Sequence, residues 1–206
     1  MDLEDGDLKG ATQNLRKAAV KPPFPDTAFY LGVAFLKQHD LSGAEKWLKA
    51  AAQLLPRDAR VEFQLAKVYR EQGRDEEAKQ ALAHSAELRR REDNDVRLKQ
   101  ECAEKLEQHL GAEASAACEQ LYDPNNAEKL TSLGTIYGQH GDLDDALKCF
   151  QRAAELAPQS PQMLYNLALT YFQLQQFEKA RAPLERALQR WPDLFQVNAL
   201  YGAVLA

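Results

Sequence analysis

The side chains of this 206-residue chain that could do chemistry are few and scattered. The chain has no G-x-x-x-x-G-K-[ST] loop to cradle phosphates, no H-E-x-x-H zinc pair, no G-x-S-x-G turn and no C-x-x-C. His39 and His140 stand beside Asp40 and Gly141, where a polar turn is the ordinary explanation, and neither has a nucleophile nearby in sequence. No catalytic residue is therefore predicted, and the chain is not expected to be an enzyme.

One cluster could in principle bind a metal, because a seven-residue step places Cys102 and His109 on one helical face, with Cys118 further along. Zinc sites need four ligands with tight local pairs, and no fourth ligand is evident. We expect packing or surface cysteines instead, and no metal or cofactor. Together with Cys149 the cysteines are odd in number and scattered, so they do not predict a disulfide framework.

The elements that carry these side chains follow a 34-residue period. One series of alanines keeps this step: Ala44, Ala78, Ala112, Ala146 and Ala180. A second series of small residues is broken only at Gln100: Gly32, Ala66, Gly134, Ala168 and Gly202. Prolines follow four of the alanines by twelve residues: Pro56, Pro124, Pro158 and Pro192. Because small residues let helices approach closely and proline cannot continue a helix, each unit is predicted to be two helices and a stop.

Bulky residues keep the same period, with leucine or tyrosine before each small residue and an aromatic residue or leucine four positions later. This pattern resembles the tetratricopeptide repeat, a helix-turn-helix unit of this length. The resemblance implies an all-α, right-handed superhelical solenoid of stacked antiparallel helix pairs, forming a single domain over residues 1–206. The expected units are half repeat 7–24, repeats 25–58 and 59–92, degenerate repeat 93–126, repeats 127–160 and 161–194, and half repeat 195–206.

The degenerate repeat has Lys99, Gln100 and Ala103 where the pattern expects leucine, a small residue and an aromatic one, although it keeps Ala112. Arg90 also stands in the slot of the missing proline. A helix is therefore predicted to run on past residue 90, supported by opposite charges three and four residues apart. The alternative is functional: a charged hinge between residues 1–92 and 127–206.

Composition limits the partners. A formal net charge of −5 and a pI near 5.5 argue against nucleic acid, whose binding needs clustered lysine and arginine. No stretch approaches the roughly 20 apolar residues of a membrane span. No signal peptide is visible, so the cytoplasm is the default expectation, and the sequence leaves open whether the chain is a fragment.

Function is then expected from surface shape. In the family that the sequence resembles, the first helices line a concave groove that binds peptides or helices of partner proteins. Carrying over the groove positions of the first helix gives these residues: Phe29, Tyr30, Val33, Leu36, Arg60, Phe63, Gln64, Lys67, Arg70, Thr131, Ser132, Thr135, Tyr165, Asn166, Leu169 and Phe172. The aromatic members predict binding anchors, since exposed apolar patches usually have a partner. The alternative is that some of them cover a neighbouring helix.

The leading hypothesis is a non-catalytic scaffold that binds a peptide or helix of a partner protein, with Asn166 as the best polar contact. The lysine and asparagine pattern of the chaperone-binding branch is missing, so no carboxylate clamp for chaperone tails is predicted. One alternative is a structural segment that self-associates through its open end repeats or belongs to a longer array. Another is the regulatory or targeting part of a larger enzyme.

Overall fold

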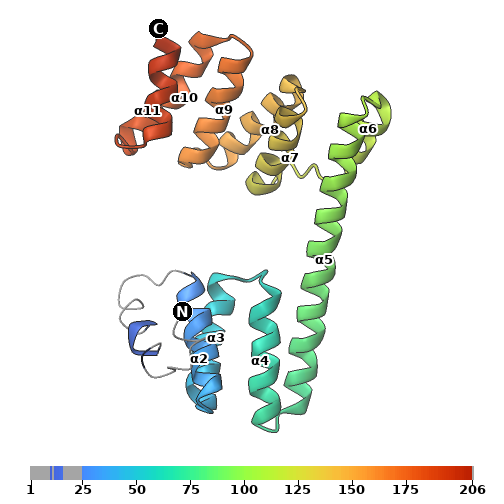
Figure 1. The fold of residues 1–206 in the computed structure, drawn as a ribbon, viewed down its shortest axis with the longest axis vertical. Coiled ribbons are helices and arrows are strands. Elements are labelled where there is room, and N and C mark those ends of the chain that lie inside the picture. Colours follow the sequence, from blue (N-terminus) through green and yellow to red (C-terminus); the bar gives the residue numbers. More distant parts are fainter. Residues whose placement is uncertain (1–9, 11, 16–24, 206) are drawn as a thin grey trace. The chain divides into compact units, whose positions relative to one another are not determined.

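A computed structural model describes Gly10, residues 12–15 and residues 25–205 of the chain, and all the regular structure in these residues is helical (Figure 1). The helices are α2 (Pro25–Lys37), α3 (Leu41–Leu54), α4 (Ala59–Glu71), α5 (Asp75–Glu107), α6 (Gly111–Glu119), α7 (Ala127–Gln139), α8 (Leu143–Leu156), α9 (Pro161–Gln173), α10 (Phe177–Arg190) and α11 (Phe195–Leu205). The predicted all-α class is confirmed.

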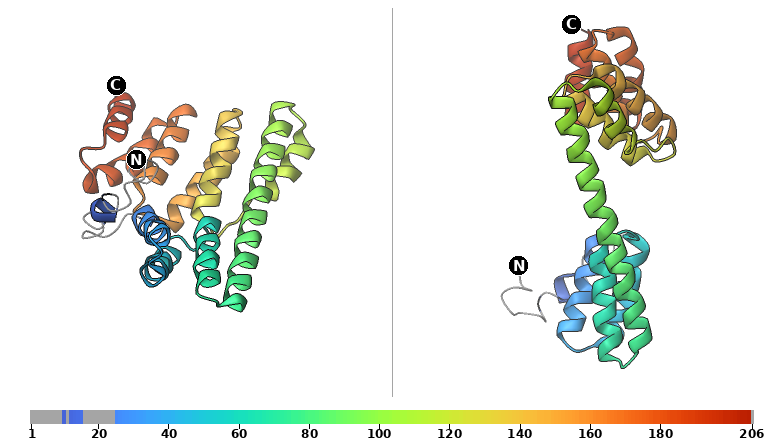
Figure 2. Two further views of the ribbon diagram at one scale, coloured as in Figure 1. Left: turned by 60° about the horizontal axis from the view of Figure 1, so that its bottom comes forward. Right: turned by 90° about the vertical axis from the view of Figure 1, so that its right-hand side faces the viewer.

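The contacts divide the chain into two compact units, Met1–Asp93 and Asn94–Ala206, and each is described by itself. In the first unit α2, α3 and α4 lie side by side in this order, and in the second unit α7 to α11 do so, each helix antiparallel to the one before it (Figure 2). The expectation of one continuous solenoid stays a prediction, because the boundary between the units falls inside α5.

Helix boundaries follow the predicted 34-residue period. Helices α3, α8 and α10 each end two residues before a proline of the series, which stops a helix because its ring excludes the next turn. Three of the first helices, α4, α7 and α9, begin after a capping side chain, which accepts backbone N–H bonds that the first turn leaves unpaired. These caps are Asp58, Asn126 and Ser160, which accept from Arg60, from Glu128 and Lys129, and from Met163.

The turns between the two helices of a repeat carry a second periodic feature, a residue with positive φ. His39, Gly73, Gly141 and Gln175 have φ values of 57°, 72°, 80° and 58°, at steps that are multiples of 34. This left-handed conformation costs little for glycine and more for other residues. The turn assignment of His39 is therefore confirmed, and His140 is the residue that directly follows α7.

Small residues lie where the two helices of a pair touch. A Cβ atom added to Gly32 of α2 would be 2.5 Å from Cγ of Leu48 in α3, which no real contact allows. In the second unit, a Cβ on Gly134 of α7 would be 3.0 Å from the Phe150 ring of α8. The small-residue series therefore marks close helix contacts, as predicted.

The degenerate repeat, formed by the end of α5 and by α6, is two residues out of phase with the others. Its positive-φ residue is His109, where the period gives residue 107. Ala112, which fits the sequence period, is exposed, whereas Ala114 is buried. The inclusion of Ala112 among the packing alanines is therefore wrong, because two additional residues before the turn rotate α6 and bring Ala114 into the contact.

The same shift brings two cysteines together. Cys102 and Cys118 are both fully buried and form a disulfide, with Cα atoms 4.8 Å apart. Their separation of 16 residues equals that of Gly32 and Leu48, so the disulfide occupies the helix contact that a small and a large residue make elsewhere. The expectation that these cysteines are unpaired is therefore wrong. Cys149 is a free, buried thiol whose pKa is raised to about 11 by burial.

Helix α5 continues without a break through the slot of the missing proline, as predicted. Between Leu88 and Leu98 none of its residues is buried. A helix segment that buries none of its side chains needs pairs along its own surface. Arg90 and Arg91 both pair with Glu87, so the supporting carboxylate precedes the arginines instead of following them as the sequence suggested.

A charged cluster joins the first two repeats. The carboxylate of Glu45 in α3 accepts hydrogen bonds from Gln72 and Arg74, which lie in the turn between α4 and α5, at 3.0 and 2.9 Å. It also pairs with Lys49 at 2.7 Å. These bonds, led by the one from Lys49, lower the pKa of Glu45 to about 2. Arg74 also pairs with Glu77 and lies over the Tyr69 ring.

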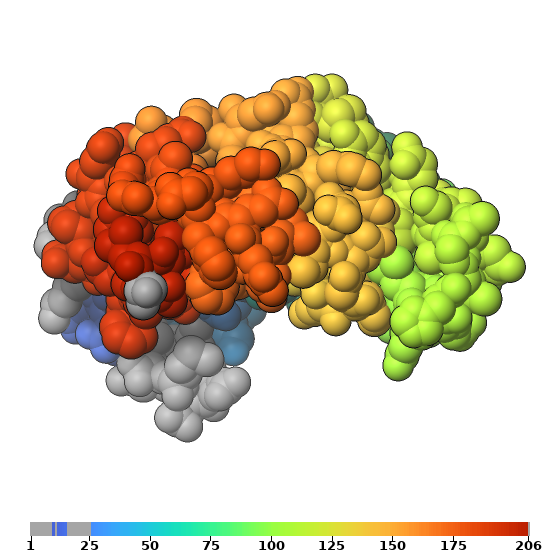
Figure 3. Space-filling model, turned by 90° about the horizontal axis from the view of Figure 1, so that it is seen from above, coloured from blue at the N-terminus to red at the C-terminus, as the bar shows by residue number. Residues whose placement is uncertain are grey.

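The structure describes the two predicted half repeats to different extents. Most of residues 7–24 lie outside the described residues, although Gly10 and residues 12–15 are helical and Leu15 packs on the first unit's core. Helix α11 is the predicted first helix of residues 195–206. It packs on α10 and α9 through Val197 and Leu200. Figure 3 shows one face of the second unit, coloured from green to red.

Candidate functional site

In the first unit the predicted groove residues come from α2 and α4, which lie next to each other. Arg60 of α4 links them, since its guanidinium lies 5.1 Å from the Phe29 ring and 3.7 Å from the Asp26 carboxylate. Tyr30 and Val33 of α2 are half-buried and pack on the unit's core. They therefore present only part of their surface to a ligand.

Two predicted groove residues in α2 belong to the core instead. Phe29 is 6% exposed and Leu36 is 9% exposed, and both are members of the first unit's buried cluster. The Phe29 ring also packs edge-to-face on Tyr30, with centroids 5.4 Å apart. Their assignment to a groove is wrong, because the neighbouring helices cover them, which is the alternative that the sequence left open.

The α4 residues remain at the surface. Phe63 and Gln64 are half-buried, and Lys67 and Arg70 are exposed. Lys67 Nζ lies 4.6 Å from the centroid of the Phe63 ring, and the guanidinium of Arg89 lies 5.3 Å from it. Arg89 comes from α5, the second helix of the pair. Sequence reasoning missed it, because the carried-over positions are all on first helices.

In the second unit, the three predicted residues of α7 are short polar side chains. The hydroxyl groups of Thr131 and Thr135 donate to the backbone carbonyls of Ala127 and Thr131, four residues earlier, at 2.7 and 2.8 Å. Such bonds engage the hydroxyl within its own helix. Thr131 and Thr135 therefore present their methyl groups to a ligand rather than free hydrogen-bond donors.

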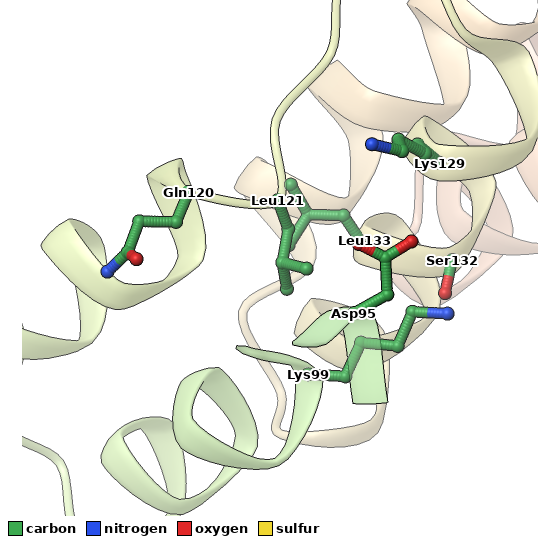
Figure 4. A pocket seen from close by; sticks show the side chains of 7 residues that line it. All are labelled: Asp95, Lys99, Gln120, Leu121, Lys129, Ser132 and Leu133. Carbon is green, nitrogen blue, oxygen red and sulfur yellow. The ribbon is translucent and has the colours of Figure 1, made fainter. Parts of the chain in front are cut away.

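A small cleft lies beside α7, and its lining is shown in Figure 4. Asp95 and Lys99 of α5 face Ser132 and Leu133 of α7 across it, and Leu121 closes another side. Its volume of about 30 Å³ is far smaller than the roughly 400 Å³ of the pocket between α9 and α11. The cleft is therefore the weaker candidate of the two for a ligand side chain.

The α9 residues form an aromatic and apolar surface. Tyr165, Leu169 and Phe172 are half-buried and pack on the unit's last core cluster. Phe172 packs edge-to-face on Phe177 of α10, with ring centroids 5.4 Å apart. Asn166 accepts a hydrogen bond from Gln162 at 2.9 Å through its carbonyl oxygen, and its amide nitrogen has no protein partner in the described part of the chain.

A larger pocket of about 400 Å³ lies between α9 and α11 and is lined by Tyr165, Gln162 and the start of α11. Phe195, at its edge, is 83% exposed. A ring of this size on the surface favours a contact with another molecule. The signal that could have identified Phe195 was the aromatic residue at the first position of the last half repeat.

The candidate metal ligands do not gather. Cys102 and Cys118 are bonded to each other, and His109 is exposed in the turn before α6. Among the described residues no group of three or more histidine, cysteine, aspartate or glutamate side chains could hold a metal ion. Within the same residues, no helix is both long enough and apolar enough to cross a bilayer.

Comparison with known families explains this combination of helix pairs and half-exposed first-helix faces. One tetratricopeptide repeat model matches residues 2–59 and 131–194, more than half of the chain, and a second matches residues 35–100. The chain belongs to the tetratricopeptide repeat family. Its members are generally non-catalytic scaffolds that bind protein partners. Residues 101–130, which contain the disulfide and the phase shift, lie outside both matches.

Among curated relatives, a UPF0162 protein of Xylella fastidiosa (strain 9a5c) is 30% identical over 110 residues, which are 50% of this chain and 39% of that protein. BBSome complex member BBS4 of Bos taurus is 32% identical over 73 residues, 35% of this chain and 14% of that protein. The chain thus spans well under half the length of these relatives.

Solved structures also resemble the chain over most of its length. MamA has a TM-score of 0.40 at 17% identity, with 93% of this chain and 92% of MamA covered. YrrB, a tetratricopeptide repeat protein with an unusual peptide-binding site, has a TM-score of 0.41 at 18% identity, with 89% and 95% covered. The family assignment rests on the family models, not on these two resemblances.

Proposed function

We propose that this chain is a non-catalytic scaffold that binds a peptide or a helix of a partner protein on the surfaces of its first helices. The observation that carries the proposal is that Tyr30 and Phe63 in the first unit, and Tyr165 and Phe172 in the second, stay partly exposed on these helices. Tyr30, Tyr165 and Phe172 pack on their unit's core with part of their surface and leave the rest open to solvent. Exposed aromatic side chains concentrate binding energy at protein interfaces.

Charge supports a protein ligand rather than a nucleic acid. The chain carries a formal net charge of −5, and nucleic-acid affinity depends on many phosphate contacts from lysine and arginine. Asn166 adds a polar group to the second unit's surface, with an amide nitrogen suited to a backbone carbonyl.

A crosslinking pulldown with the full chain tests this function. The double variant Phe63→Ala, Tyr165→Ala is compared with wild type after circular dichroism shows that it is folded. The matched control is Leu54→Ala, Leu156→Ala, which removes two exposed apolar side chains from the second helices α3 and α8. We expect a specific partner to be lost with the first variant and kept with the control. Equal recovery with both variants would refute binding through the first-helix surfaces.

A second candidate function is self-association through the last helix. A Cβ atom added to Gly202 of α11 would meet nothing within 4 Å, whereas Gly32 and Gly134 lie against a second helix. Leu205 is 54% exposed on the same helix. A second copy of the chain could cover this face. Light scattering over a concentration series tests it, since self-association must increase with concentration and Gly202→Arg should abolish it.

A further inference from the structure

Two positively charged side chains from different helices lie over the ring of Phe63. Lys67 reaches it from the next turn of α4, and Arg89 reaches it from α5. A buried hydrogen bond joins the two helices one turn earlier, where Ser85 Oγ of α5 donates to the backbone carbonyl of Ala59 in α4 at 2.8 Å. Arg89 is thus held against Phe63 by the packing of the repeat itself.

These cations lack acidic partners. In the part of the chain that the structure describes, no carboxylate lies within 4 Å of Lys67, Arg89 or Arg70, which stands one turn beyond Lys67. Glu62 pairs with His84, Glu71 with His39, and Glu87 with Arg90 and Arg91. Glu92 and Asp93, three and four residues after Arg89 on α5, are exposed and form no ion pair among the described residues. By contrast, Arg60 and Arg74 on the same unit each form two ion pairs.

Among the described residues other cations, such as Lys46, also lack an ion pair, but Lys67, Arg70 and Arg89 lie on the same surface as the Phe63 ring, on a chain of net charge −5. Like charges that share one surface repel each other, and contacts with an aromatic ring offset only part of that repulsion. An anionic group of a bound partner would neutralise these charges and remove the repulsion. Guanidinium groups bind carboxylates in a bidentate manner, and the lysine adds a point charge, so carboxylates suit these donors.

We propose that Phe63, Lys67, Arg70 and Arg89, here called the Phe63 patch, bind an acidic peptide segment that has an aromatic or apolar side chain beside its carboxylates. The carboxylates pair with the three cations, and the apolar side chain packs on the half-buried Phe63 ring. The proposal rests on the function proposed above and names the chemistry of its ligand in the first unit. Because Arg89 belongs to a second helix, the patch is wider than a first-helix groove.

Fluorescence anisotropy with the full chain tests the ligand chemistry. The first synthetic peptide alternates glutamate with tryptophan, the second replaces every glutamate by glutamine, and the third replaces every tryptophan by alanine. We expect the first to bind, with an affinity that falls as salt rises, and each replacement to weaken binding about tenfold or more. Equal binding of the glutamine peptide would overturn the proposal, because it would show that carboxylates are not recognised.

Charge-reversal variants test the location. Lys67→Glu and Arg89→Glu should each weaken binding of the first peptide about tenfold or more. The matched control is Lys46→Glu, which changes net charge equally. Lys46 is an exposed lysine of α3 in the same unit and forms no ion pair with any described carboxylate. We expect the control to bind as wild type does. An equal loss in all three variants would mean unspecific attraction and would refute the patch.

Two further outcomes separate this proposal from others. Displacement of the peptide by a uridine oligonucleotide at equal affinity would mean a general polyanion site, and would overturn recognition of an acidic peptide. If the peptide fails to bind while the pulldown partner is still lost in the Phe63→Ala, Tyr165→Ala variant, the ligand chemistry is wrong and the scaffold function stands. If both fail, the first-helix surfaces do not bind a partner.

Discussion

The repeat formed by α7 and α8 and the repeat formed by the end of α5 and α6 make the same helix contact with different chemistry. In the first, Gly134 lets the Phe150 ring lie against the backbone of α7. In the second, the equivalent positions are Cys102 and Cys118, which are bonded to each other. A regular repeat is held by shape, whereas the shifted repeat is held by a covalent bond.

The difference in helix length explains why a bond is used there. Helix α8 has 14 residues and buries five of them, whereas α6 has nine residues and buries three. A short helix with few buried side chains gains little from apolar burial, which is roughly proportional to area. A disulfide stabilises such an element by restricting the unfolded chain.

The largest expected effect comes from removing that bond. The variant Cys102→Ala, Cys118→Ala should lose about 3 kcal/mol of stability, the loop-closure value for a loop of this length. Thermal unfolding should show a lower midpoint for the variant, and reductant should lower the midpoint of wild type but not of the variant. Thiol labelling in denaturant provides the control: without reductant only Cys149 should react, and with reductant all three cysteines should. Three reactive thiols without reductant would disprove the disulfide.

A substitution at the repeated alanine tests the phase shift directly. Ala146→Leu in α8 should cost about 1–3 kcal/mol, because a fully buried contact is overpacked. Ala112→Leu, at the same place in the sequence period, should change stability by less than about 0.5 kcal/mol, because Ala112 is exposed. Ala114→Leu should resemble Ala146→Leu. Chemical denaturation measures the stability of all three variants. A large loss from Ala112→Leu would mean that Ala112 lies in the helix contact and that this repeat keeps the regular phase.

The ion pairs of the two regions should differ in their response to acid. The pKa of Glu45 is lowered from 4.5 to about 2, so its contribution to stability is complete above pH 4.5 and is lost as pH falls toward 2. Glu45→Gln should therefore remove part of the acid sensitivity of unfolding. In the shifted repeat, Glu113 pairs with Lys105 on the surface, and Glu113→Gln should change the pH profile much less. Equal profiles for both variants would contradict this contrast.

The smallest effect is expected at the turns. His39 and His109 both have positive φ, where a side chain costs more than a hydrogen atom does. His39→Gly and His109→Gly should each be neutral or stabilise the chain by up to about 1 kcal/mol, since relief of the left-handed strain is opposed by greater unfolded-state entropy. Thermal midpoints measure this, with Gly73→Ala as the opposite change, which should destabilise. A marked loss from His109→Gly would mean that its side chain has another role.

Most of the fold was predictable because the repeat is local. The spacing of Gly32 and Ala44, and the stops at Pro56 and Pro158, depend on helix geometry within one unit, and the structure confirms them. The continuous helix past Arg90 followed from a missing proline. The candidate surface was predicted less well: Phe63 is exposed in part, but Phe29 is covered by neighbouring side chains, which position in the repeat does not reveal.

By itself, the sequence determined the helix pairs, their boundaries and the 34-residue order, because these follow from residues close together along the chain. Only the tertiary structure decided that Cys102 meets Cys118, that Ala114 replaces Ala112, and that Arg89 lies against Phe63. Each of these depends on the rotation of one helix against another. For the cysteines and Ala114, two additional residues before the turn alter that rotation, although Ala112 and Pro124 keep the 34-residue period.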